Sequence, residues 1–144
     1  MALRKRTPSR WKPMDWGKMW SSLACRYHEI LDCLDKHNLV PNVTLHHFVH
    51  PTWWESMGAF EKAENLVHFV KFCELAAANF GKRVQLWCTF NEPTTYTVCG
   101  YMVGVHPPGK VFNFWLVGTV RSNHSWFCFS QCIGWVTPDI FLIY

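Results

Sequence analysis

The pattern of apolar and polar positions predicts two helices and two strands before residue 111. Residues 20–37 and 61–80 repeat apolar side chains every three to four positions, the period of a helix with one buried face. The apolar runs 39–45 and 84–90 lack that period and predict buried strands. We expect His37-Asn38 to end the first helix and Gly81 to end the second. The predicted inner faces are Leu23, Tyr27, Ile30, Leu31 and Leu34 in the first helix and Leu66, Val67, Val70, Leu75, Ala76 and Phe80 in the second.

The order helix, strand, helix, strand, without hairpin signals between the strands, predicts an α/β fold with parallel strands. The first strand is followed by His46-His47 and the second by Asn91-Glu92. Carboxyl ends of parallel strands lie at the same edge of a sheet, where α/β proteins bind ligands. His47 and Glu92 are therefore expected to converge, although they lie far apart in the sequence.

Two segments carry the signals of loops. Residues 51–58 contain proline, glycine and the pair Trp53-Trp54, and residues 100–109 are rich in glycine and proline. The two tryptophans either stack on the flat apolar face of a sugar or belong to the core. We expect core packing for at least one of them.

Composition and charge exclude several classes of partner. The net charge of +4 is mild, and much of it comes from residues 1–13, which lack the interleaved aromatics of a nucleic-acid surface. We therefore expect a solvated terminus and no nucleic-acid partner. No apolar run is long enough to span a bilayer, and no secretory signal follows the basic start. The seven cysteines show no CxxC pair and no zinc spacing, which favours a reducing, cytoplasmic location.

The composition changes near residue 111. Residues 111–144 hold only two charged residues, Arg121 and Asp139, together with nine aromatic residues. Such a tail is insoluble if exposed, so it either packs against the rest of the chain or is not a product of the same selective history. We divide the chain into a basic segment 1–13, a body 14–110 and a divergent tail 111–144.

Asn91 and Glu92 form the strongest chemical signal. At a strand end, the amide can bond a substrate hydroxyl while the carboxyl group donates a proton to a leaving group. The plainer interpretation is that Glu92 is simply a solvated surface glutamate. From these two residues alone, a catalytic role and a solvated glutamate are about equally well supported.

Three histidines, His46, His47 and His50, suggest a metal site. Neighbouring residues of a strand point to opposite faces, so His46 and His47 cannot bind one ion together. His50 lies past the strand end, and no acidic ligand is nearby in the sequence. We therefore predict no metal and no cofactor. We expect one histidine of the pair to face the pocket and the other to face the packing side.

Three segments of the body carry a family resemblance. Residues 44–51 read Thr-Leu-His-His-Phe-Val-His-Pro, and residues 89–93 read Thr-Phe-Asn-Glu-Pro. The third segment is Gly100-Tyr101-x-x-Gly104-x-x-Pro107-Pro108-Gly109. In sequence and spacing they resemble the retaining β-glycosidases of glycoside hydrolase family 1, the β-glucosidase family. The resemblance covers residues 14–110.

This resemblance implies a (β/α)8 barrel that hydrolyses β-glucosides or related β-glycosides with retention. His47 would bond hydroxyls of the sugar, Asn91 would contact its 2-hydroxyl, and Glu92 would be the acid/base. A retaining mechanism also needs a second carboxylate ~5–5.5 Å away as the nucleophile. The family takes it from a Thr-Glu-Asn-Gly motif on a later strand, and this sequence lacks that motif.

The chain therefore looks like a fragment from the amino-terminal half of such an enzyme. A barrel of this type takes ~250 residues, whereas this chain offers about two strand–helix units and an aromatic-rich tail. We expect negligible activity from the isolated chain. The alternative is a non-catalytic pseudoenzyme remnant that binds carbohydrate or a partner. The sequence determines neither the sugar (glucose, galactose or a 6-phosphosugar) nor the oligomeric state.

Overall fold

The computed structural model describes residues 16–111, 115, 117–120 and 141–143. Residues 115 and 117–120 are helical. The other elements, in chain order, are α1 (Trp16–Lys36), β1 (Asn42–His46), α2 (Thr52–Met57), the 3₁₀ turns η1 (Ala59–Glu61) and η2 (Ala63–Asn65), α3 (Leu66–Phe80), β2 (Leu86–Phe90), α4 (Pro93–Val98), the π-helical turn η3 (Cys99–Val103) and β3 (Phe141–Ile143). None of the helices in these residues is both long and apolar enough to cross a membrane.

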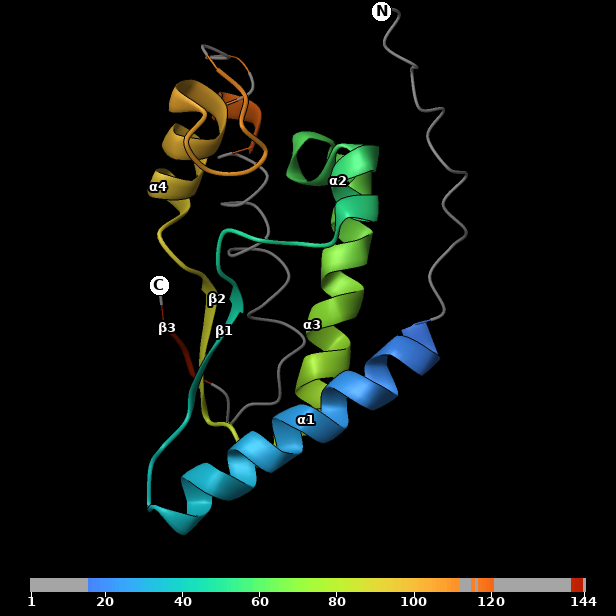
Figure 1. Cartoon of the computed structure of the whole chain (residues 1–144), viewed down its shortest axis with the longest axis vertical. Coiled ribbons are helices and arrows are strands. Elements are labelled where there is room, and N and C mark those ends of the chain that lie inside the picture. The colour runs from blue at the N-terminus through green and yellow to red at the C-terminus, as the bar shows by residue number, and fades with distance from the viewer. Residues whose placement is uncertain (1–15, 112–114, 116, 121–140, 144) are drawn as a thin grey trace, which may run out of the picture.

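The strands form one parallel sheet in the order β1-β2-β3. Asn42 pairs with Leu86 and His46 with Phe90, so the predicted parallel pairing of the first two strands is confirmed. The third strand was not predicted. It comes from the segment that the sequence marks as a divergent tail, and it occupies the edge of β2 that β1 leaves open (Figure 1).

Helix α1 ends at Lys36, as His37-Asn38 predicts. Asn38 takes a left-handed conformation, with φ of 54°, and the Leu39 N–H donates to the Leu34 carbonyl oxygen. The predicted inner face is only partly correct, because Leu31 is buried while Tyr27 is 52% exposed. Leu23 and Ile30 are exposed as well. Figure 1 shows that α1 crosses below the sheet and the foot of α3, so that only part of its length lies against another element of the described structure.

The first strand begins later than the apolar run predicts. β1 spans Asn42–His46 rather than 39–45, and Val40 is 74% exposed. The end of α1 holds Leu39 by a hydrogen bond to Leu34, and Pro41 has no N–H to donate to a sheet. Regular pairing can therefore start only after the proline.

Residues 51–58 contain a helix where the sequence predicts a loop. Pro51 precedes α2, and its carbonyl oxygen accepts hydrogen bonds from the N–H groups of Trp54 and Glu55. Proline is favourable at a helix start because the first N–H groups have no partner within the helix. Gly58, with φ of 100°, ends the helix in the left-handed conformation that glycine adopts without strain.

The second predicted helix is divided. The short turns η1 and η2 come first, and regular helix begins only at Leu66. Its predicted end at Phe80 is confirmed, although Gly81 keeps a right-handed conformation with φ of −57°. The N–H groups of Arg83 and Val84 donate to the Phe80 carbonyl oxygen and close the helix end.

Two hydrophobic clusters lie at opposite ends of the strands. The strand-end cluster lies where β1 and β2 finish and consists of Trp54, Ala59, Phe60, Phe69, Phe90, Tyr96, Tyr101 and Val120. The strand-start cluster lies where they begin and consists of Ala24, Leu31, Ala76, Phe80, Val84 and Trp87. Helix α3 contributes to both. Val120 shows that at least one residue beyond Lys110 packs against the body of the chain.

Candidate functional site at the strand ends

The three predicted site residues follow directly on the two paired strands. The last residues of β1 and β2, His46 and Phe90, are partners in the sheet. The pairing continues one step further, because the Asn91 N–H donates to the His46 carbonyl oxygen at 2.9 Å. His47 and Glu92 therefore leave the sheet at the same edge, as predicted.

The two adjacent histidines have opposite environments. His46 is only 2% exposed, whereas His47 is exposed and its ring contacts Phe48 with 5.1 Å between centroids. This difference in burial agrees with the expectation that the two side chains point to different sides, and it makes His46 the member on the packing side. His47 is the member of the pair that a ligand can reach.

Each strand turns away from the sheet through a residue in the left-handed region. Phe48 follows His47 with φ of 65°, and Glu92 follows Asn91 with φ of 41°. Neither residue is glycine, so each conformation costs roughly 1–2 kcal/mol in steric strain. Strained residues of this kind cluster at functional sites, where the surrounding structure holds them. The exposed Glu92 side chain and the half-buried Asn91 therefore project from a fixed turn.

A buried aromatic layer supports these turns from behind. The ring of Phe48 stacks on Tyr96 with 6.4 Å between centroids and 7° between planes. The hydroxyl oxygens of Tyr96 and Tyr101 are 3.3 Å apart, within hydrogen-bonding distance. Burial raises the pKa of both phenols well above the usual range, so both hydroxyl groups stay neutral. The layer therefore supplies packing and hydrogen bonds rather than charge.

The glycine-rich segment after α4 is part of this support. The sequence predicts a turn-rich loop over residues 100–109, but Cys99–Val103 forms a π-helical turn. The Lys110 N–H donates to the Gly100 carbonyl oxygen at 2.9 Å, and the Lys110 ammonium group pairs with Glu61. Glycine is required at position 100, because a Cβ there would lie 2.9 Å from the Pro107 carbonyl oxygen.

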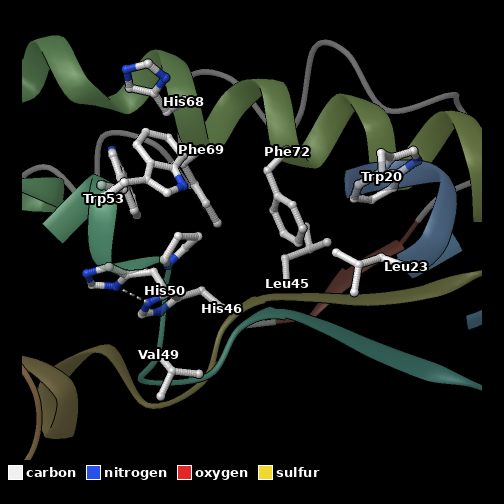
Figure 2. Close-up of a pocket in the computed structure, with 12 residues that line it drawn as sticks. Trp20, Leu23, Leu45, His46, Val49, His50, Trp53, His68, Phe69 and Phe72 are labelled. Carbon is white, nitrogen blue, oxygen red and sulfur yellow. Dashed lines mark hydrogen bonds between the residues drawn. The ribbon is translucent and has the colours of Figure 1, made fainter. Parts of the chain in front are cut away.

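Sequence reasoning missed a hydrogen-bonded series of side chains beside the site. It found no acidic residue near His50, yet Glu55 Oε2 lies 2.8 Å from His50 Nε2. His50 Nδ1 in turn lies 3.3 Å from His46 Nε2 (Figure 2). The sequence signal that could have revealed this series is Pro51-Thr52, which marks the start of a helix. A helix over residues 52–57 brings Glu55 back toward His50. Among the described residues, no group of three or more His, Cys, Asp or Glu side chains is arranged to hold a metal ion.

A cavity of about 180 Å³ lies behind the strand end, between β1 and the helices (Figure 2). Aromatic side chains form much of its wall, including Trp20, Trp53 and Phe72, and His46 and His50 lie at one side. His47 does not line it, so this cavity is separate from the predicted sugar site. The prediction that one tryptophan is core is confirmed, because Trp54 is buried and its Nε1–H donates to the Asn65 carbonyl oxygen.

The strand-end arrangement suits proton transfer beside a hydroxylated ligand. Glu92 is exposed to a ligand, with an amide in Asn91 and an imidazole in His47 at the same edge. Two other carboxylates are already engaged, Glu55 by His50 and Glu61 by Lys110.

Comparison with known proteins identifies the lineage. The sequence model of glycosyl hydrolase family 1 matches residues 22–128, and so continues past Lys110 into the predicted tail. A 6-phospho-beta-galactosidase of Streptococcus equi subsp. zooepidemicus is 34% identical over 117 residues, covering 81% of this chain and 24% of that protein.

Two solved structures are similar in fold as well. A beta-glycosidase from Pyrococcus horikoshii matches with a TM-score of 0.68 and 34% identity. The match covers 81% of this chain and 26% of the Pyrococcus chain. A beta-glucosidase from Thermotoga maritima in complex with glucoimidazole matches with a TM-score of 0.67 and 29% identity, covering 70% and 23% respectively. The chain thus spans about a quarter of the length of these relatives.

The parallel strands and intervening helices described above are consistent with one part of the barrel of these enzymes. The family match covers well over half of the sequence, and it includes both strand ends with His47, Asn91 and Glu92. The chain therefore belongs to glycosyl hydrolase family 1.

Proposed function

We propose that this chain carries the acid/base half of a retaining β-glycosidase site, within about two strand–helix units of a (β/α)8 barrel. Glu92 protonates the glycosidic oxygen, Asn91 contacts the sugar 2-hydroxyl, and His47 bonds other sugar hydroxyls. The observation that carries the proposal is the pairing of the two strand ends, each followed by a strained left-handed turn. That geometry supports the proposal because it brings to one edge three side chains that can form hydrogen bonds with a sugar.

The chemistry has two steps, and the chain supplies one of its two carboxylates. A nucleophile must first attack the anomeric carbon while Glu92 protonates the departing oxygen. Glu92 then removes a proton from water, which releases the sugar from the nucleophile. The family's Thr-Glu-Asn-Gly nucleophile motif does not occur in these 144 residues. By themselves, these residues are expected to have negligible hydrolytic activity.

The substrate class is β-glucosides or related β-glycosides. The similar Thermotoga protein is named a beta-glucosidase and the Streptococcus protein a 6-phospho-beta-galactosidase, so the family relatives differ in the sugar they are named for. His47 and Asn91 form hydrogen bonds with hydroxyl groups that these sugars share.

The cysteine pattern favours a reducing compartment, and we place the chain in the cytoplasm.

A chimera tests the role of Glu92. Residues 22–110 would replace the matching segment of the Pyrococcus horikoshii beta-glycosidase, which supplies the rest of the barrel. Glu92→Ala should lower kcat/KM for an alkyl β-glucoside by about 10²–10⁴-fold, the usual contribution of a general acid. It should lower kcat/KM far less for a dinitrophenyl β-glucoside, because that leaving group needs no proton. Glu64→Ala, at an exposed glutamate, is the matched control.

Two results would contradict this proposal. Equal losses for both leaving groups would mean that Glu92 does not act as an acid. Hydrolysis of an aryl β-glucoside by the isolated 144-residue chain, abolished by Glu92→Gln, would mean that the chain needs no outside nucleophile.

A non-catalytic carbohydrate-binding remnant is the second candidate. It is favoured by the tail residues that complete the described structure: β3 covers the outer edge of β2, and Val120 enters the strand-end cluster. Calorimetric titration of the isolated chain with glucoimidazole should then give saturable heat that His47→Ala removes. A flat titration of a folded chain excludes this candidate.

A further inference from the structure

A partly buried series of hydrogen bonds connects Glu55 to the strand end. Glu55, in α2, lies 2.8 Å from His50 Nε2, and His50 Nδ1 lies 3.3 Å from His46 Nε2. The exposed fraction of the side chain is 29% for Glu55 and 8% for His50. The series therefore runs from the surface to the interior, and Figure 2 shows its two imidazoles side by side.

The carboxylate determines where the protons lie. An ionised carboxylate only accepts hydrogen bonds, so His50 must carry a proton on Nε2. In neutral His50 the other nitrogen, Nδ1, is then an acceptor, and the contact with His46 requires a proton on His46 Nε2. One charged group thus fixes the tautomers of two neutral imidazoles in series.

The surroundings of His46 make this fixed neutral state favourable. Aromatic rings enclose its imidazole, with centroids 5.1 Å away for Phe60 and Tyr96 and 5.6 Å for Phe90. The Tyr96 phenol stays neutral because burial raises its pKa. A charge on His46 would be poorly solvated there, whereas a neutral ring in one orientation packs well.

His46 also anchors the predicted sugar-binding edge. Its carbonyl oxygen accepts the Asn91 N–H at 2.9 Å, and His47 is its neighbour in the chain. We propose that Glu55 and His50 are positioning residues, which lock the ring of His46 and thereby hold the joined ends of β1 and β2. The link to sugar binding rests on the proposed function, but the lock itself does not.

Histidine spectra of the full chain test the lock directly. In ¹⁵N-labelled protein at mildly alkaline pH, where ordinary imidazoles are neutral, both His46 and His50 should carry the proton on Nε2. This first measurement needs no variant. A proton on Nδ1 of neutral His50 would overturn the proposal, because Glu55 would then not orient the series.

Glu55→Gln supplies the second measurement. Its side chain is nearly the same size but can donate as well as accept, so both tautomers of His50 and His46 become accessible. The Asn91 amide should exchange with solvent faster by about tenfold, because the strand ends open more often. Glu64→Gln, at an exposed glutamate, should change neither signal. Unchanged tautomers, or unchanged Asn91 exchange, in Glu55→Gln would overturn the proposal.

Titration with glucoimidazole separates this inference from the proposed function. If the wild-type chain binds it, Glu55→Gln should weaken binding, because His47 and Asn91 are then held less firmly; the reference magnitude is the loss of about 10–100-fold that follows when the hydrogen-bond partner behind a metal-binding histidine is removed. Equal binding by both proteins would contradict the positioning role. If the folded wild-type chain binds no sugar analogue, the sugar role fails for the isolated chain, while the tautomer and exchange measurements still decide the lock.

Discussion

The strand-start and strand-end clusters are built in different ways, although the same strands and the same helix α3 join them. The strand-start cluster contains mainly apolar side chains, and its one large polar group, Trp87 Nε1–H, donates to the Val84 carbonyl oxygen. The strand-end cluster surrounds buried His46 and packs under the left-handed residues Phe48 and Glu92. The difference indicates that both ends provide packing, while only the strand-end cluster also supports the strained turns from which the proposed sugar-binding side chains project.

Truncating one large ring in each cluster should sharpen this contrast. Phe60→Ala and Phe80→Ala should each lower the free energy of unfolding by about 3–5 kcal/mol, because both rings are buried. Of these two rings, Phe60 is the one that contacts His46, with 5.1 Å between ring centroids. Only Phe60→Ala should therefore alter the His46 signals in the spectrum of the folded protein. Equal changes from Phe80→Ala would mean that the two ends are not independent.

The close approach of two segments at the strand end gives the next largest effect. Gly100→Ala would place a Cβ 2.9 Å from the Pro107 carbonyl oxygen, so unfolding free energy should fall by about 1–3 kcal/mol. Gly118→Ala is the matched control, because no other part of the described structure outside its own helix lies within 4 Å of its Cβ position. In that helical position alanine should raise stability, by up to about 1 kcal/mol. Urea unfolding of both variants measures the difference, and the same sign for both would contradict the steric argument.

The strands that carry the site could be predicted well from the sequence. The side-chain contacts and the third strand that support them could not. Parallel strands and their polar ends follow from local periodicity, so the placement of His47 and Glu92 at one edge was predictable. The series from Glu55 to His46 was not, because it depends on a short helix started by Pro51 and hidden among loop signals. The pairing of β2 with β3 was not predictable either, since it joins segments far apart in the sequence.

Backbone strain at Glu92 can be tested through glycine. Glu92→Gly removes a left-handed penalty of about 1–2 kcal/mol and adds about 0.5–1 kcal/mol of chain entropy cost. The free energy of unfolding should therefore rise slightly, by up to about 1.5 kcal/mol. Glu74→Gly, in the exposed middle of α3, should lower it by about 0.5–1 kcal/mol. A loss of stability in Glu92→Gly would show that the turn is not strained.

The smallest effect is expected at the strand start, from a surface charge cluster. Arg83 Nη2 lies 2.6 Å from Asp35 and 2.8 Å from Asp32, and so joins α1 to the segment before β2. Both carboxylates are well exposed, so Arg83→Ala should lower the free energy of unfolding only slightly. Repeating the unfolding measurement in 1 M salt should remove most of that difference. A larger, salt-independent loss would mean that the stem of Arg83 packs as part of the strand-start cluster.

The pairing of β2 with β3 also sets an order of events during synthesis. Leu86 pairs with Phe141, about 55 residues later in the chain. At roughly 5–20 residues per second, the ribosome adds that stretch in roughly 3–11 s. Throughout that interval Phe141–Ile143 is not yet available to pair with the outer edge of β2, and an open edge attracts other chains. The nascent polypeptide is thus open to aggregation at this edge until Phe141–Ile143 emerges and pairs with β2.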